Sequence, residues 1–475
     1  MPGRSAALWL APLLAACPVG PSFVRPAPPV GRRYLHEAGP QETVAAEGAR
    51  QRFEAGAQLP ADWWRLFRSA KLDALVAASL AHNQTLAAAQ ASLSQSDALL
   101  KAGYGVFFPQ ISGSGSAARE EFNPKSVGLS FASAAFNLFS LSASVSYALD
   151  VFGGERRQVE ALGAQVDLQR YEYRAAYLAL TGNVVETVAA RAGYRAQLAA
   201  TRGLIEAEKE QVALGTDQAR AGVGTWASVL SLESQLAATQ ATLPPLQQKI
   251  EQAEHLLAVL AGGAPADFDA PAIELADLAL PADVPVTLPA DMVRRRPDVL
   301  AAEAQLHAAN AQIGVATAAM LPRFSLNPSV GLENGQISSL FSASSVVWNL
   351  GASLTAPLFA GGTLWFQRKA AVAARTQALA SYRQTVLSAL EQVADALRAL
   401  ANDAELLDAE GRALRAAEEG LQLTQANYRA GVASYLQVLT ADGQLLQARL
   451  GHDQAVAQRL QDTAALFVAL GGGWR

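Results

Sequence analysis

Few residues of this chain have the types and the spacing that catalysis or metal binding requires. The five histidines lie far apart and form no His-Glu-x-x-His motif: His36, His82, His255, His307 and His452. A single cysteine, Cys17, excludes disulfides within the chain and argues against a zinc site. The sequence also contains no Gly-x-Ser-x-Gly turn and no glycine-rich phosphate loop followed by Lys-Ser/Thr. It therefore predicts neither an enzyme nor a bound metal ion.

Cys17 carries a different chemical signal, because it follows a short apolar run. Residues 1–16 contain Arg4 and end in Leu-Ala-Ala, so that the tetrad ending at Cys17 matches a bacterial lipobox. In such a motif the chain is cut before a cysteine that then receives acyl chains; the alternative is a stray N-terminal cysteine. Each buried methylene group of an acyl chain contributes about 0.8 kcal/mol to anchoring. We expect a lipoprotein signal peptide over 1–16, a covalent lipid on Cys17 and no other cofactor, and an extended lipidated tether over 17–60.

The densest charge cluster reads Val-Arg-Arg-Arg-Pro-Asp-Val over residues 293–299. Pro297 suits the first turn of a helix, and Asp298 is favourable beside a helix N-terminus. The pattern predicts a solvated helix start rather than a catalytic site.

Composition limits the remaining function classes. Of 475 residues, 17% are charged, the formal net charge is −5 and no basic stripe indicates nucleic acid. Beyond the N-terminus no run of about 18 apolar residues occurs, which argues against a membrane-spanning helix. A chain of this kind can cross a bilayer only as a closed β-barrel.

Four segments have the alternation of half-exposed strands. From Phe139 to Val151 the odd positions are apolar, whereas the even ones are mostly serine. Residues 345–359 and Phe324–Val330 alternate in the same way, and a weaker Gly/Ser-rich segment lies near Gln110–Ser116. Each predicted strand has one apolar face and one polar face.

The strands belong to two copies of one unit. The segments Arg-Ala-Gly-Val at Arg220 and at Arg429, and three further landmarks, recur at a spacing of about 210 residues in the same order. We expect a first repeat over 61–263, a linker over 264–287 and a second repeat over 288–475. Each repeat consists of a helix, two strands, a very long helix, the Arg-Ala-Gly-Val turn and one return helix.

The second long helix has a seven-residue period. Its apolar positions are Val386, Val393, Leu400, Leu407, Leu414, Leu421 and Tyr428. A heptad sustained in this way indicates left-handed coiled-coil packing. Residues from Gly362 to Arg429 would form a helix about 100 Å long at 1.5 Å per residue.

Four strands cannot close into a membrane barrel, since the smallest barrels have about eight strands. Two copies of the chain would supply eight strands, but such a barrel is filled by its own side chains. Three copies would supply twelve strands and leave an aqueous pore. The predicted fold is therefore an α+β membrane channel: a trimeric 12-stranded β-barrel continued by an α-helical coiled-coil tunnel.

Two blocks, residues 62–93 and 288–326, resemble the TolC/OprM family of outer-membrane efflux channels, in particular its lipoprotein (NodT-type) branch. The resemblance implies a homotrimer at the bacterial outer membrane, with its tunnel in the periplasm. It also implies a passive exit duct for small toxic compounds, joined to a periplasmic adaptor and an inner-membrane pump of the resistance-nodulation-division type. Alternatives are the duct of a type I protein secretion system and a lipid-anchored periplasmic scaffold.

The resemblance also assigns roles to residues. Contacts with the adaptor would involve the two hairpin tips: Arg220, Gly222, Val223, Arg429, Gly431 and Val432. The aspartates that narrow the family's entrance are replaced by Gln437 and Thr440, so we expect an aperture held by hydrogen bonds and packing near these residues and near Tyr428 and Tyr435. Barrel would meet tunnel at two glycine pairs: Gly153, Gly154, Gly361 and Gly362.

Overall fold

The computed structural model describes residues 18–27, 31, 33–36, 41–122, 128 and 134–472. The predicted signal peptide and Cys17 lie outside these residues. The chain forms two compact units. Unit 1 contains the N-terminal residues up to Pro26, Leu93–Gln169 and Ala302–Tyr382; unit 2 contains Ala27–Ser92, Arg170–Ala301 and Arg383–Arg475. Within the described part of the chain, every helix is too short or too polar to cross a membrane.

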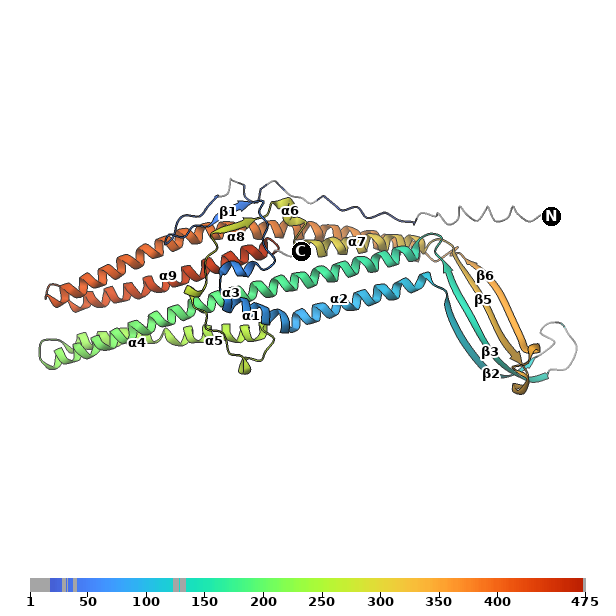
Figure 1. Cartoon of the computed structure of the whole chain (residues 1–475), viewed down its shortest axis with the longest axis horizontal. Helices are drawn as coiled ribbons and strands as arrows, with labels where there is room; N and C mark the ends of the chain where they lie inside the picture. Colours follow the sequence, from blue (N-terminus) through green and yellow to red (C-terminus); the bar gives the residue numbers. More distant parts are fainter. Residues whose placement is uncertain are drawn as a thin grey trace. The chain divides into compact units, whose positions relative to one another are not determined.

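Unit 1 contains an antiparallel sheet of four strands in the order β2-β3-β5-β6 (Figure 1). The strands are β2 (Gln110–Phe122), β3 (Ala134–Leu149), β5 (Arg323–Asn334) and β6 (Val346–Thr355). The four predicted strands are confirmed, but two of the predicted ends are wrong. The second strand stops before Asp150, which caps the following helix, and the fourth stops at Thr355 because Pro357 lacks the N–H that a ladder needs.

The helices include two of 67 residues each, α3 and α8. The full set is α1 (Ala70–His82), α2 (Gln84–Gly103), α3 (Gly154–Arg220), α4 (Trp226–Gln240), α5 (Leu243–Leu260), α6 (Pro289–Val293), α7 (Pro297–Ala318), α8 (Thr363–Arg429) and α9 (Tyr435–Ala469). In unit 2, α8 and α9 lie side by side (Figure 1). The heptad positions of α8 from Val386 to Leu414 are buried, which confirms the predicted packing seam.

The two repeats differ in their return helices, contrary to the prediction of one helix in each. The second repeat returns through the unbroken helix α9, whereas the first returns through α4 and α5, separated at Ala241 and Thr242. Pro244 and Pro245 follow this break and occupy the first turn of α5. Proline has no backbone N–H and clashes with the preceding turn, so an uninterrupted helix cannot pass through this pair.

Unit 2 has an aromatic core at the end of α9. The rings of Trp63 and Phe467 lie 5.6 Å apart in an edge-to-face arrangement, and Phe67 packs against the same phenylalanine. All three side chains are 1% exposed or less. Trp63 and Phe67 belong to the block at 62–93, so these two side chains of the block form part of the core.

A two-stranded parallel sheet joins two segments that lack a clear strand pattern. Strand β1 (Arg52–Ala55) pairs with β4 (Asp283–Val286). The first strand lies in the segment predicted as a tether and the second in the segment predicted as a linker. Tyr34 donates a hydrogen bond from its hydroxyl to the Thr287 carbonyl at 2.7 Å. The described parts of the predicted tether and the predicted linker therefore pack against each other. Their amino-acid composition does not predict this packing.

Candidate functional site

The sheet of unit 1 has two chemically distinct faces across all four strands. On one face, serine hydroxyls of β2 and β3 pair directly: Ser112 with Ser144 at 2.9 Å, Ser114 with Ser142 at 2.9 Å and Ser116 with Ser140 at 2.8 Å. On the same face Ser325 of β5 meets Ser353 of β6 at 2.7 Å. This hydroxyl ladder confirms the polar face predicted from the sequence, and its hydrogen bonds leave further acceptor and donor capacity for water.

The opposite face is mainly apolar in β3, β5 and β6, whereas β2 places Ile111 and Ala117 there together with two glycines, Arg119 and Glu121. Leu141 of β3 faces Leu332 of β5, and Val330 of β5 faces Trp348 of β6. Many of these side chains are exposed; Trp348 and Leu350 are 76% and 78% exposed. An exposed apolar band of this size on a single chain indicates contact with lipid or with another protein.

Both edges of the sheet are open in the described chain. Strands β2 and β6 each pair on one side only. An edge strand presents unpaired N–H and C=O groups that can pair with a strand of another chain. The sheet is therefore chemically suited to be extended at both sides.

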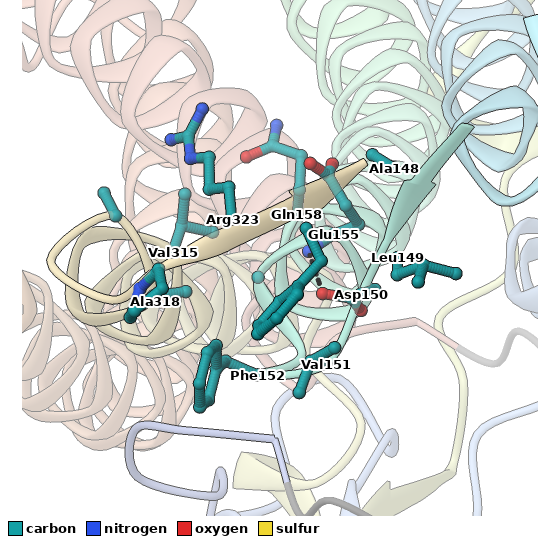
Figure 2. Close-up of a pocket in the computed structure, with 14 residues that line it drawn as sticks. Ala148, Leu149, Asp150, Val151, Phe152, Glu155, Gln158, Val315, Ala318 and Arg323 are labelled. Carbon is teal, nitrogen blue, oxygen red and sulfur yellow. Dashed lines mark hydrogen bonds between the residues drawn. The ribbon is translucent and has the colours of Figure 1, made fainter. Parts of the chain in front are cut away.

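Strand β3 passes into helix α3 through a tight turn with its own helix cap. The carboxylate of Asp150 accepts hydrogen bonds from the backbone N–H groups of Glu155 at 3.1 Å and of Arg156 at 3.0 Å. Gly153 has a backbone φ of +77°, which residues other than glycine rarely adopt. Figure 2 shows this turn beside a pocket of about 170 Å³, into which Phe152 of the turn and Val315 of α7 contribute side chains.

In the second repeat, two consecutive glycines form the corresponding turn from strand to helix. Gly361 and Gly362 have φ +57° and +84° immediately before helix α8, and Gly154 is the first residue of α3. The four glycines predicted to form the barrel–tunnel elbow thus lie at the two strand-to-helix turns.

An extended N-terminal segment is attached to the first of these turns. The Val19 N–H donates to the Phe152 carbonyl at 2.9 Å, and a Cβ on Gly153 would lie 2.5 Å from Pro18. The Arg157 side chain donates hydrogen bonds to the carbonyls of Val19 and Gly20. The residue that directly follows Cys17 is therefore held at the start of α3.

The hairpin tips in unit 2 have nearly identical backbones. Gly222 and Gly431 have φ +78° and +74°, and the two following backbone N–H groups return to the helix end at Gln218 and at Asn427. This is the Schellman-type ending that favours glycine. Val223 and Val432 are both 79% exposed, so each tip presents an uncovered apolar side chain.

Residues predicted at the aperture lie beside the tips, but in different roles. The Tyr428 hydroxyl and the Gln218 amide are hydrogen-bonded at 2.9 Å, which ties α8 to α3, and the ring of Tyr435 lies 5.2 Å from that of Tyr428. Burial raises the pKa of Tyr435. The side chain of Gln437 instead caps α9 by accepting from the Ser434 N–H at 2.6 Å, and Thr440 bonds within its own helix.

Near these tyrosines lies a buried acid, Asp442, which the sequence places slightly beyond Gln437 and Thr440 and not among the aperture candidates. Asp442 is 2% exposed, and its carboxylate accepts a hydrogen bond from the Gln211 amide of α3. Burial raises its pKa. This carboxyl group is therefore enclosed within the chain rather than exposed at its surface.

The prediction of a solvated helix start at residues 293–299 is wrong for Arg296. This side chain is 7% exposed and binds Asp298, the Gln392 side chain of α8 and the Ala469 carbonyl at the end of α9. Pro297 does begin α7 as predicted. The burial was not visible in the sequence, because the partners of Arg296 lie up to 173 residues away.

Solved structures with this arrangement are outer-membrane channels. The structure of the outer-membrane channel OprN superposes with a TM-score of 0.86 at 29% identity, covering 96% of this chain and 100% of that one. This chain has the same arrangement: two-faced strands are joined by glycine turns to long paired helices. Its fold is therefore that of an outer-membrane channel.

The sequence comparisons assign the family. The outer membrane efflux protein family matches residues 75–263 and 288–472. Outer membrane protein OprJ of Pseudomonas aeruginosa is 30% identical over 98% of this chain and 95% of its own length. The cation efflux system protein CusC of Escherichia coli is 27% identical over 97% of both chains. The chain belongs to the outer membrane efflux protein family, whose members are efflux channels of the outer membrane and not enzymes.

Proposed function

We propose that three copies of the chain close their sheets into a 12-stranded barrel through the outer membrane, with the hydroxyl ladder inside. The observation that carries this proposal is the two-faced register of β3, β5 and β6, which the serines of β2 extend on the polar side, together with the open edges of β2 and β6. In this arrangement β2 of one copy pairs with β6 of the next, and the apolar face meets lipid. The helices of the three copies form the coiled-coil tunnel across the periplasm, and the whole is a passive exit duct.

Cysteine accessibility tests which face lines the pore. In planar bilayers, a charged, water-soluble thiol reagent added to Ser142→Cys should lower the conductance of the channel. The matched variant Leu141→Cys, one residue away on the apolar face, should not respond. A response of Leu141→Cys instead of Ser142→Cys would contradict the proposed orientation, and a monomer without conductance would contradict the barrel itself.

The N-terminus is proposed to carry the lipid anchor on Cys17, after removal of residues 1–16. The attachment of Pro18 and Val19 to the turn after β3 supports an anchor at the membrane end of unit 1. Labelled palmitate should be incorporated into the wild-type protein and not into Cys17→Ser. Equal labelling of both proteins would reject Cys17 as the modified residue.

The partners are proposed to be a periplasmic adaptor and an inner-membrane pump of the resistance-nodulation-division type. The exposed Val223 and Val432 at two equivalent tips support an apolar contact with the adaptor, flanked by Arg220 and Arg429. Val223→Asp combined with Val432→Asp should abolish adaptor binding without changing the trimer. Leu230→Asp, an exposed apolar position on α4, is the matched control and should bind normally.

The aperture is proposed to close through the Tyr428–Gln218 hydrogen bond and the packing of Tyr435, not through a cation-binding ring. Tyr428→Phe should therefore raise the conductance of the resting channel. Multivalent cations added on the periplasmic side should cause little block; strong block would contradict this closure.

The cargo is proposed to be small toxic compounds. The relative CusC is named for cation efflux rather than for the efflux of small toxic compounds. The name of one relative therefore does not assign the cargo of this chain. Protein export through a type I system is the second candidate. Deletion of the chain should increase the susceptibility of the cell to small inhibitors; unchanged susceptibility with loss of a secreted protein would favour the second candidate.

A further inference from the structure

Unit 1 contains parts of four helices, which follow the order of its strands (Figure 1). Helices α2 and α7 precede β2 and β5, and helices α3 and α8 follow β3 and β6. Each neighbouring pair of helices is joined by a close contact: Gly103 with Leu162 for α2–α3, Glu160 with His307 for α3–α7, and Asn310 with Arg375 for α7–α8. Helices α2 and α8 are therefore the outer ones, as β2 and β6 are the outer strands.

The internal repeat predicts one more contact of this kind. Helices α2 and α3 of the first repeat correspond to α7 and α8 of the second, so the α2–α3 contact has its counterpart in the α7–α8 contact. The α3–α7 contact crosses from the first repeat to the second, and its counterpart joins α8 to an α2. Because α2 and α8 are the outer helices of one chain, this α2 must belong to a second copy.

Shared landmarks of the two repeats show which residues are equivalent. Helices α3 and α8 are both 67 residues long and begin at Gly154 and at Thr363, so their equivalent positions are 209 residues apart. Pro109 and Pro322 lie directly before β2 and β5, so equivalent positions of α2 and α7 are 213 residues apart. The contact between α3 and α7 therefore specifies which residues of α8 and α2 would meet.

Three positions that are buried on α3 are exposed on α8. On α3, all three are 5% exposed or less: Arg157, Ala161 and Ala164. Their equivalents on α8 are all exposed, and we call them the α8 face: Phe366, Ala370 and Ala373. They lie three or four positions apart and therefore share one side of the helix. The Phe366 side chain is 65% exposed, although its equivalent on α3 is buried.

The first helix of each repeat shows the same difference. On α7, Ala311 and Gly314 are buried. Gly314 leaves room for the Arg157 side chain, since a Cβ on this glycine would lie 2.6 Å from Arg157 Cγ. The equivalents on α2 are Ala98 and Lys101, which we call the α2 face, and both are exposed. The surfaces that are buried on α3 and α7 are therefore uncovered on α8 and α2.

The residue types on the α8 face suit a contact that forms when copies assemble. Arg157 is partnered within its own chain, by Glu160 at 2.6 Å and by two carbonyls of the N-terminal segment. The Phe366 side chain has no polar atom that needs a partner, so a second copy can bury it after the chain has folded. Further exposed apolar side chains flank the two faces: Leu358 and Phe359 before α8, and Phe108 and Ile111 after α2. Such a group of exposed apolar side chains indicates a contact surface.

We propose that the α8 face of one copy packs against the α2 face of the next copy, in the register of the α3–α7 contact within a chain. This inference rests on the proposed barrel, in which β6 pairs with β2 of the next copy. Because α8 follows β6 and α2 precedes β2, both helices then leave the sheet at the same end. Phe366 takes the place of Arg157. The methylene stem of Lys101 covers its ring, while Lys101 Nζ stays with Asp97, 2.5 Å away.

The proposal assigns the apolar residues at the start of α8 to a contact between copies rather than to lipid or to a different protein. The junction between copies then repeats the helix arrangement of the junction within a copy. It uses apolar contacts where the junction within a copy uses the N-terminal segment and the buried Arg157.

A disulfide between copies tests the proposed register. Within one chain, a Cβ on Gly154 would lie 2.8 Å from the Ala318 Cβ, and the equivalent pair between copies is Thr363 with Gly105. The two Cβ atoms of this pair should therefore be close enough for a disulfide. A Cβ on Gly105 meets no atom within 4 Å in its own chain, so a cysteine there should be tolerated.

The variant combines Gly105→Cys and Thr363→Cys with Cys17→Ser, which removes the only native thiol. On mild oxidation of the protein in detergent, it should form covalent dimers and trimers on a denaturing gel without reductant. The matched control combines Gly105→Cys with Trp365→Cys in the same background. Trp365 lies two positions after Thr363, about 200° around the helix, so the control should remain monomeric on the gel.

Light scattering and bilayer conductance of the same sample separate a failure of this register from a failure of the barrel. A conducting trimer whose cysteine pair stays reduced, or whose Trp365 control cross-links equally, overturns the proposal and leaves the barrel in place. A monomer without conductance overturns both. If the cysteine pair does not fold, Phe366→Asp replaces it, because this side chain is exposed in the single chain. Phe366→Asp should dissociate the trimer at a lower temperature than Trp365→Asp does, and equal dissociation overturns the proposal.

Discussion

The clearest single perturbation is the removal of the Arg296 guanidinium. This buried group makes four hydrogen bonds: to the two Asp298 carboxylate oxygens at 3.0 and 2.7 Å, to the Gln392 amide oxygen at 2.7 Å and to the Ala469 carbonyl at 2.6 Å. It connects the start of α7 to α8 and to the last turn of α9. Arg296→Met keeps much of the side-chain volume and removes every donor.

The expected loss in the free energy of unfolding follows from the burial of Arg296 and its hydrogen-bond partners. Breaking a buried, hydrogen-bonded ion pair on one side costs about 3–5 kcal/mol, because the remaining groups lose their partner away from water. Asp298 keeps a side chain that is 41% exposed and can be hydrated, which places the expected loss near the lower end, about 3 kcal/mol. Arg296→Lys should recover part of this loss, since a lysine supplies charge but not the bidentate geometry.

The assay is guanidinium unfolding of the detergent-solubilised protein, followed by far-ultraviolet circular dichroism. Arg295→Met is the matched control, because the neighbouring Arg295 is exposed, and it should change the free energy of unfolding by no more than about 0.5 kcal/mol. If Arg296→Met unfolds at the same denaturant concentration as Arg295→Met, the reasoning from burial and hydrogen bonding is refuted.

Three further outcomes are expected in the same assay. Gly193→Val should cost about 1–3 kcal/mol, because a Cβ there would lie 2.5 Å from Ala457 of α9, whereas Gly203→Val in the same helix meets no atom within 4 Å and should avoid this overpacking cost. Gly431→Ala should cost about 1 kcal/mol, since its φ of +74° is unfavourable for alanine; no loss would show that the tip relaxes into another turn. The free energy of unfolding should fall between about pH 4 and pH 7 by up to about 4 kcal/mol through Asp403, a fall that Asp403→Asn should remove and whose persistence there would point to other acids.

Local periodicity was sufficient to predict the sheet and the long helices. The alternation around Ser140 and Ser142 fixes which side chains share a face, since neighbouring strands pair residue by residue. The seven-residue spacing of Val386 to Leu414 likewise identifies the buried seam of α8. Both patterns reflect the geometry of a single strand or helix. They can therefore be recognised in the sequence without knowledge of the fold.

Element ends were predicted less well, because they depend on a few specific contacts. Strand β3 stops before Asp150 because that side chain is used to cap α3, and the return chain of the first repeat breaks beside Pro244 and Pro245. The prolines were visible in the sequence and could have predicted the break. The capping role of Gln437 was also foreseeable, because it lies three residues after Ser434 in a capping-box spacing.

The sequence by itself determined that the chain is a duplicated unit of two-faced strands and heptad helices with tight glycine tips, because these features repeat within short windows. Only the tertiary structure decided where the charged groups go. Arg459 meets Gln51 and Thr43 across 408 and 416 residues of chain, and Arg296 meets Ala469 across 173. A buried arginine and an exposed one have the same letter and often similar neighbours in sequence; what separates them is whether distant segments bring acceptors close enough to replace water, and that is a property of the packed chain.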